Sequence, residues 1–142
     1  MEEFGLLDCL CYNFYVIGFV DNIEELTLTN NNFRQVLFTG QHAQLVVMSL
    51  NPSEDIGMEV HSTTDQFLRV EKGEGKVIMN GEESLLKDGS AIVVPAGTEH
   101  NVVNTSSQNP LKLYTVYSPP HHKDLTIHAT KKDAEADTED HL

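Results

Sequence analysis

A histidine that follows a short strand and a tight turn is the first residue whose setting suggests chemistry. Residues 89–104 read GSAIVVPAGTEHNVVN. A strand must stop at Pro95, because proline has no N–H to give to a sheet, and Gly97 allows the tight turn that follows. The chain then returns as a strand that carries the imidazole of His100, a common metal ligand, onto one face.

Three further candidate ligands lie upstream of this segment. Glu59 and His61 are two residues apart, so both side chains point to the same side of an extended chain. Gln66 begins the next apolar run, after a short turn. Carboxylates, imidazoles and amide oxygens all bind divalent metal ions, so these residues and His100 form one candidate set if the fold brings them together.

The elements that must position these residues are strands rather than long helices. Between residues 33 and 119, short β-rich runs alternate with turn residues at a spacing of about ten residues. The expected strands are 33–39, 43–50, 66–71, 76–79, 90–94, 101–103 and 111–117. Asn80-Gly81 lies between two apolar runs and predicts a two-residue hairpin turn. This pattern is typical of an all-β sandwich or barrel.

The two ends of the chain differ from this middle part. Residues 6–20 (LLDCLCYNFYVIGFV) are apolar, but they fall short of the roughly 20 residues of a spanning helix and lack the basic start of a signal peptide. We therefore expect residues 1–20 to form an N-terminal arm or extra strand, followed by one domain over 21–120. Residues 121–142 include five acids between positions 133 and 140 and predict a solvated acidic C-terminal tail with at most a short helix.

Four of the 7 histidines lie in this predicted tail, at His121, His122, His128 and His141. Adjacent residues of a strand point to opposite faces, so His121 and His122 would not easily bind one ion together. We interpret all four as surface residues.

Net charge and cysteine content indicate which partners are disfavoured and which cellular compartment is expected. The 142 residues carry 9 Lys and Arg against 22 Asp and Glu, a formal charge of -13, which disfavours nucleic acid and anionic membranes as partners. Cys9 and Cys11 are separated by one residue, where a disulfide would be strained. The sequence therefore predicts a protein of the reducing cytoplasm.

The segment around His100 resembles the second signature motif of the cupin superfamily. The matching pattern is G-x5-P-x-G-x2-H-x3-N over residues 89–104. The first cupin motif is G-x5-H-x-H, then Glu and, six residues later, Gly. It matches in part, because His61 falls at the second His and Gly73 at the last Gly, whereas the leading Gly57 comes too early. The two motifs and the residues between them span 48 of the 142 residues, from 57 to 104.

The two departures from the first motif compensate each other in charge. Glu59 stands where the first His is usual, and Gln66 stands where the Glu is usual. The resemblance implies an all-β cupin jelly-roll barrel, or double-stranded β-helix, in which Glu59, His61, Gln66 and His100 hold a divalent metal ion (Zn, Fe, Mn, Ni or Co). This set carries one negative charge, as does the usual set of three His and one Glu.

The resemblance leaves several functions open and assigns no catalytic residue. A Gln-x-His pair with a further Glu and His is the ligand set of type I phosphomannose isomerases, so a mannose-6-phosphate isomerase-like enzyme of a carbohydrate-like or polar metabolite is one expectation. Two His and one carboxylate are also the ligands of non-haem iron dioxygenases. A non-catalytic cupin that binds a metal or small ligand is the third. The family also implies a homodimer, because its members pair through edge strands.

Overall fold

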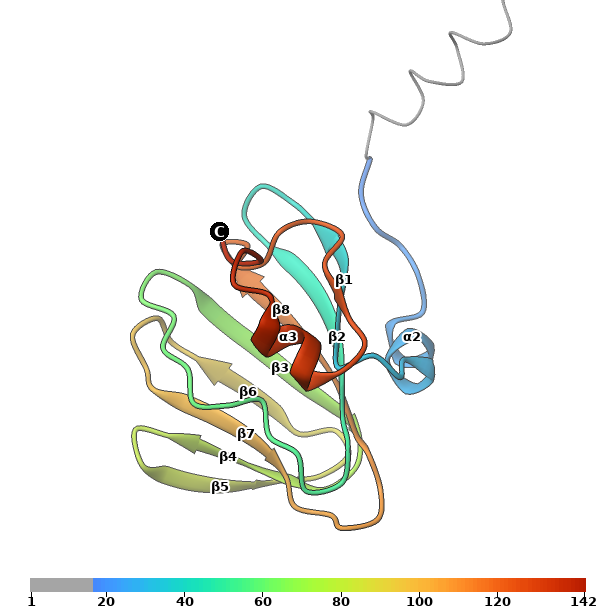
Figure 1. Cartoon of the computed structure of the whole chain (residues 1–142), viewed down its shortest axis with the longest axis vertical. Helices are drawn as coiled ribbons and strands as arrows, with labels where there is room; N and C mark the ends of the chain where they lie inside the picture. The colour runs from blue at the N-terminus through green and yellow to red at the C-terminus, as the bar shows by residue number, and fades with distance from the viewer. Residues whose placement is uncertain (1–16) are drawn as a thin grey trace, which may run out of the picture.

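The computed structural model describes residues 17–142, in which two antiparallel β-sheets face each other (Figure 1). The larger sheet contains, in spatial order, β6 (Ala91–Val94), β3 (Asp65–Lys72), β8 (Leu111–Ser118), β2 (Gln44–Leu50), β1 (Arg34–Thr39) and β9 (Ile127–His128). The smaller sheet contains β5 (Glu82–Leu86), β4 (Gly75–Met79) and β7 (His100–Asn104). Two short helices, α2 (Ile23–Thr29) and α3 (Lys131–Ala136), complete the described part. The prediction of an all-β fold is confirmed.

Each expected strand is present, with ends within one residue of the expected ones. The predicted hairpin also forms, because Asn80 (φ 48°) and Gly81 (φ 85°) adopt the left-handed backbone of a two-residue turn between β4 and β5. Strand β5 itself was not expected. Its sequence, EESLL, has no apolar alternation, and four of its five residues are exposed.

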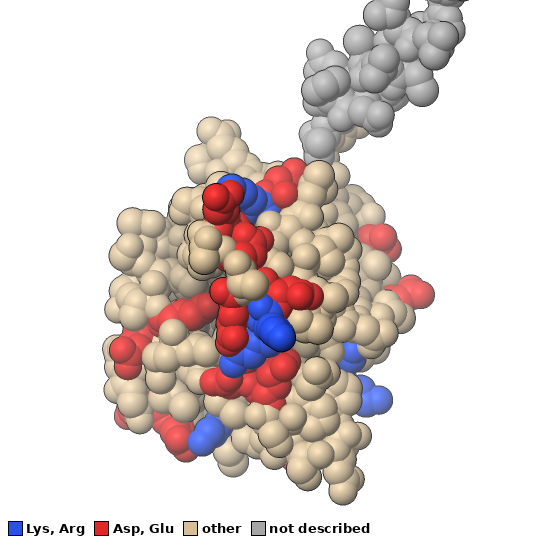
Figure 2. Space-filling model, viewed as in Figure 1, with Lys and Arg blue, Asp and Glu red and all other residues tan. Residues whose placement is uncertain are grey.

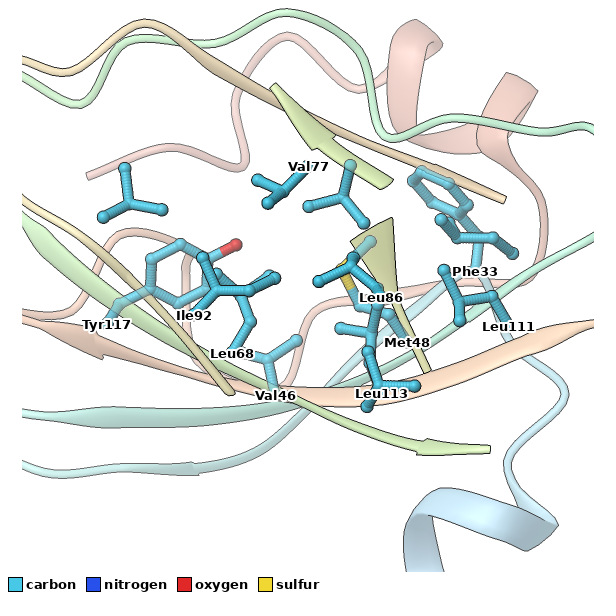
Figure 3. Close-up of a cluster of buried hydrophobic side chains, with 14 of the residues drawn as sticks. Phe33, Val46, Met48, Leu68, Val77, Leu86, Ile92, Leu111, Leu113 and Tyr117 are labelled. Carbon is cyan, nitrogen blue, oxygen red and sulfur yellow. The ribbon is translucent and has the colours of Figure 1, made fainter. Parts of the chain in front are cut away.

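Alternate residues of the strands fill the space between the two sheets. On β3, Gln66, Leu68 and Val70 are buried, whereas Arg69 points outward and pairs with Glu71 at 3.0 Å. Figure 3 shows the resulting core, with Tyr117, Ile92 and Leu68 at one end and Leu111 and Phe33 at the other. The candidate ligand Gln66 therefore continues the inward row of side chains at the Tyr117 end of the core, because Tyr117 is its cross-strand partner on β8.

The C-terminal segment, residues 119–142, is folded back onto the two sheets (Figure 1). Strand β9 pairs with β1, and His122, His128 and Asp140 are buried. Figure 2 shows acidic and basic side chains gathered on the face where α3 lies. The interpretation of these histidines as surface residues is wrong for His122 and His128. The tail is not simply solvated, because Asp140 is buried and pairs with Arg34 of β1.

Part of the N-terminal arm expected over residues 1–20 lies outside the described residues. Only positions 17–20 can be compared with that expectation, and there Ile17 and Val20 are exposed. Neither helix within residues 17–142 has the length and apolar character needed to cross a membrane.

Asp55, in the connection between β2 and β3, ties α3 to the sheets. Its carboxylate pairs with Lys131 at the start of α3 and accepts a hydrogen bond of 2.8 Å from the Asn101 amide. The Lys131 and Asn101 hydrogen bonds lower the pKa of Asp55 below its usual value of 3.8. A lowered carboxyl pKa stabilises the fold above the unfolded pKa, and this contribution is lost as the pH falls through the folded pKa.

We therefore expect Asp55→Asn to lower the free energy of unfolding at pH 7 by between about 0.2 and 1 kcal/mol, because the ion pair is partly exposed and screened by solvent. Urea unfolding at a series of pH values should show the wild type and the variant converging below pH 3.8. A difference that stays the same from pH 7 to pH 3 would show that ionisation of Asp55 contributes nothing.

Candidate metal centre

Glu59, His61 and His100 come together from separate segments of the chain. One ligand atom from each of these residues lies within 4.8 Å of the other two. Glu59 and His100 face each other because the N–H of each donates to the C=O of the other, both at 2.9 Å. The extended segment expected at 59–61 is therefore a single bridge to β7 rather than a strand.

His61 is tied to the turn that precedes His100. Its carbonyl oxygen accepts a hydrogen bond of 2.8 Å from the N–H of Gly97, whose φ of +85° suits glycine. The carboxylate of Asp65 accepts another from Ala96 N–H, also at 2.8 Å. The Pro-x-Gly turn therefore places His61 as well as His100.

The contact between His61 and Glu59 is short but is not a hydrogen bond. His61 Nε2 lies 3.2 Å from Glu59 Oε2 and, although buried, has no hydrogen-bond partner among the described residues. With the ring proton on Nδ1, Nε2 would direct a lone pair at the carboxylate, and a cation between the two atoms would relieve their repulsion. This arrangement is the one expected of two ligands that share an ion.

His100 presents a similar pair with Gln66. Its Nδ1 lies 2.8 Å from the Thr98 carbonyl oxygen, which can only accept, so the proton of the neutral ring is on Nδ1. Nε2 then directs a lone pair at Gln66 Oε1, 3.1 Å away, while the Gln66 amide N–H donates to Thr115 Oγ1 at 3.0 Å. A cation, a second proton or rotation of the amide relieves this contact.

The carboxyl of Glu59 is ionised at neutral pH, as a metal ligand must be. Burial by itself raises the pKa of Glu59. The contact with His61 and the positive charge of Arg34 lower the pKa by more than burial raises it, so the pKa lies below 4.5. One carboxylate, one amide oxygen and two imidazoles therefore fit a divalent ion in charge and in ligand chemistry. The assignment of Glu59, His61, Gln66 and His100 as ligands stays a prediction that metal analysis can test.

The sequence did not indicate that residues of the C-terminal segment would surround this set. The ring of His121 lies 4.2 Å from that of His61 and 5.5 Å from that of Tyr117, measured between centroids. Burial, with His61 and His141, lowers the pKa of His121 to about 4, so the ring is neutral at pH 7. The only sequence signal for it was the density of histidines in residues 121–141.

A buried glutamine holds the chain at His121 and His122. Gln44, the first residue of β2, accepts hydrogen bonds from the N–H groups of His121 (3.2 Å) and His122 (2.9 Å) through its Oε1. Its Nε2 donates to the carbonyl oxygen of His122 at 2.7 Å. The amide therefore fixes the entry of the C-terminal segment next to the candidate ligands.

Arg34, on β1, is the buried cation nearest to this region and is already matched by acidic and imidazole groups. Its Nη1 lies 3.9 Å from Asp140 Oδ2 and 3.5 Å from His128 Nδ1. Asp140 Oδ1 in turn accepts a hydrogen bond of 2.5 Å from His122 Nδ1. The guanidinium therefore faces the C-terminal segment, and its charge is balanced by Asp140, although its buried Nε has no hydrogen-bond partner among the described residues.

Two facing antiparallel sheets with imidazole and carboxylate side chains converging between them define a β-barrel protein with a candidate metal centre. Residues 46–117 match the family model described as the cupin domain, and the chain belongs to the cupin family. The prediction of a cupin jelly-roll fold is confirmed. Some cupins are metal-binding enzymes, and membership of the family supports the binding of a small-molecule ligand.

Similar proteins come from bacteria and from a virus. The chain is 52% identical over 124 residues to the uncharacterized protein YrkC of Bacillus subtilis, an alignment that covers 83% of this chain and 66% of YrkC. It is 45% identical over 108 residues to the uncharacterized protein L612 of Acanthamoeba polyphaga mimivirus, covering 73% of this chain and 67% of L612. The chain thus spans about two thirds of the length of each of these relatives.

The fold is also that of a solved relative. The crystal structure of BH2720 from Bacillus halodurans is 48% identical and has a TM-score of 0.82, over 84% of this chain and 94% of that chain.

Proposed function

We propose that this cupin holds a divalent metal ion through Glu59, His61, Gln66 and His100 and acts on a small polar, carbohydrate-like metabolite. The observation that carries the proposal is the convergence of Glu59, His61 and His100, whose ligand atoms lie within 4.8 Å of one another. A bound ion would polarise a carbonyl or hydroxyl oxygen of the ligand, which is the chemistry of a sugar isomerase.

The surroundings favour an uncharged ligand over a phosphorylated one. A phosphosugar needs free cationic groups, but Arg34 is matched by Asp140. The His121 ring packs on His61 and, being neutral at pH 7, adds no positive charge to this side of the centre. We therefore propose isomerase-like chemistry, similar to that of mannose-6-phosphate isomerases, on an unphosphorylated substrate.

A second candidate function follows from the same three residues. Two imidazoles and one carboxylate are the ligand set of non-haem iron(II) oxygenases. With Glu59, His61 and His100 as the ligands of iron, positions would remain open for oxygen and substrate. Oxygen uptake by the iron-loaded protein separates this function from isomerisation, which consumes no oxygen.

Metal analysis of the untagged protein tests the proposed centre. We expect His100→Ala to remove one equivalent of bound divalent ion, because it deletes a ligand from the buried set, and His42→Ala, at an exposed histidine, to remove none. Glu59→His restores the usual cupin residue and should keep the ion, whereas Glu59→Ala should lose it. The proposal is wrong if His100→Ala binds the same ions with unchanged stoichiometry and affinity.

The substrate screen uses the metal-loaded wild-type protein, and His100→Ala serves as the negative control. Isomerisation in deuterated water replaces a carbon-bound hydrogen of the sugar with deuterium. NMR follows this exchange for a set of unphosphorylated sugars and a set of phosphorylated sugars. Exchange with the unphosphorylated set alone supports the proposal. Exchange with the phosphorylated set alone contradicts the choice of substrate.

The proposal includes a cytoplasmic homodimer. In the described part of the chain, the larger sheet ends at β6 and β9, and an open sheet edge can pair with a second copy. Light scattering after size-exclusion chromatography measures the mass directly, and a monomer at all concentrations contradicts the dimer.

A further inference from the structure

A second group of imidazoles lies beside the proposed metal centre, within the C-terminal segment. One ring nitrogen each from His121, His122 and His141 lies within 4.8 Å of the others. The ring centroids are 4.8 Å apart for His121 and His122, 4.6 Å for His121 and His141, and 5.4 Å for His122 and His141. We propose that these three histidines bind a second metal ion, of the Zn²⁺ type that prefers imidazole ligands.

The backbone holds the three residues together, which makes the cluster part of the fold. On the sheet side, the Gln44 side chain forms hydrogen bonds with the main chain of His121 and His122. On the other side, the N–H of Leu142 donates to the carbonyl oxygen of His121 at 2.9 Å, and His122 and His141 form a β-bridge. Residues 119–126 form no regular strand, so the alternation that would separate adjacent side chains does not apply to His121 and His122.

The tautomer of His122 suits a ligand role. Its Nδ1–H donates to Asp140 Oδ1 at 2.5 Å, so the lone pair of the neutral ring is on Nε2. The Tyr117 hydroxyl lies 3.4 Å from Nε2, and an ion would take its place as the partner of this nitrogen. A carboxylate behind the second ring nitrogen is the usual arrangement of metal-bound histidines, because it orients the ring and raises its basicity. Burial, followed by Arg34, lowers the pKa of His122, and this keeps the ring neutral at pH 7.

A bound ion would draw the three ring nitrogens together. Tetrahedral Zn–N bonds of about 2.0–2.1 Å place nitrogens about 3.3 Å apart, somewhat closer than the upper limit of 4.8 Å found here. The side chain of His141 is 58% exposed, so its ring can rotate and an ion can enter from solvent. A site with three imidazoles leaves the fourth position free for water or a ligand.

A third cluster, formed by His128, Asp137 and Asp140, has a different explanation. Its ligand atoms are equally close, but the Arg34 guanidinium lies 3.5 Å from His128 Nδ1 and 3.9 Å from Asp140 Oδ2. A positive charge is therefore already present there, and no ion is proposed. No comparable cation lies within hydrogen-bond distance of the His121, His122 and His141 rings in the part of the chain described.

The inference does not rest on the proposed function, because the two sets of ligands share no residue, although the His121 ring lies 4.2 Å from that of His61. We propose to titrate the untagged full-length chain with Zn²⁺ by calorimetry and to count bound zinc by mass spectrometry. The wild type should bind two equivalents. His141→Ala and His121→Ala should each bind one, whereas His42→Ala should bind two.

The same titration of His100→Ala separates this site from the first. His100→Ala should lose the first ion and retain the second. The failure of one proposal can therefore be distinguished from the failure of the other. The second site is overturned if His141→Ala and His121→Ala bind as much zinc as the wild type. It is also overturned if His100→Ala abolishes all binding, since one shared centre would then explain the data. Circular dichroism of each variant tests whether the fold is kept. Of these variants, His141→Ala should disturb the fold least, because the His141 side chain is exposed.

Discussion

Leu113→Ala is expected to lower the free energy of unfolding by about 3–5 kcal/mol, the cost of an unfilled cavity in a rigid core. Leu113 lies on β8 and is 0% exposed. Its cross-strand neighbours are Met48 on β2 and Val70 on β3, both fully buried, so removal of the side chain leaves a cavity inside the packed core. Urea unfolding followed by circular dichroism measures the loss.

Leu85→Ala is the matched control for this prediction. Leu85 lies on the outer strand β5 and is 87% exposed, so the same chemical change there should alter stability by less than about 0.5 kcal/mol. Equal effects at Leu113 and Leu85 would contradict the placement of β8 at the centre of the core.

Asp140→Asn is expected to release the C-terminal segment from the sheets. The change removes the negative charge beside Arg34, and loss of one partner of a buried ion pair costs about 3–5 kcal/mol. Asp140 also contacts His122 and His128, so the variant weakens several links at once. Because the segment can detach while the sheets stay folded, the observed cost is limited to the free energy that holds it in place.

Limited trypsin digestion detects this release. Lys131 and Lys132 lie in α3, and cleavage there should be about 10-fold faster or more in Asp140→Asn than in the wild type, since even 1.4 kcal/mol of destabilisation populates the open form 10-fold more. Asp124→Asn changes an exposed carboxylate in the same segment and should leave the rate unchanged. If the wild type and Asp140→Asn are cut equally fast, Asp140 does not anchor the segment.

Local patterns in the sequence predicted seven of the nine described strands and the setting of His100. Pro95 and Gly97 each act on their own stretch of backbone, so their effect is visible without the rest of the fold. The family resemblance implied that Gln66 faces the cavity, and Gln66 is buried on β3. The family resemblance supplied the remaining step, which is that separate strands face one cavity.

The role of the C-terminal segment could not be predicted in this way. Five acids between positions 133 and 140 are typical of a solvated tail, and the burial of Asp140 depends on the distant Arg34 together with His122 and His128. The same holds for His121 and His122, whose places depend on the Gln44 side chain some 77 residues away in sequence. Long-range polar contacts of this kind leave no periodic signal in the chain.

The position of β8 has a consequence for how the protein is made. This strand lies between β3 and β2 and pairs with both, so residues 44–50 and 65–72 join one sheet only through residues 111–118. A growing chain on the ribosome that ends before Leu111 therefore has two half-sheets with unpaired inner edges, which are prone to associate with other chains. Protection of these edges by chaperones during synthesis would matter most in the interval before β8 emerges.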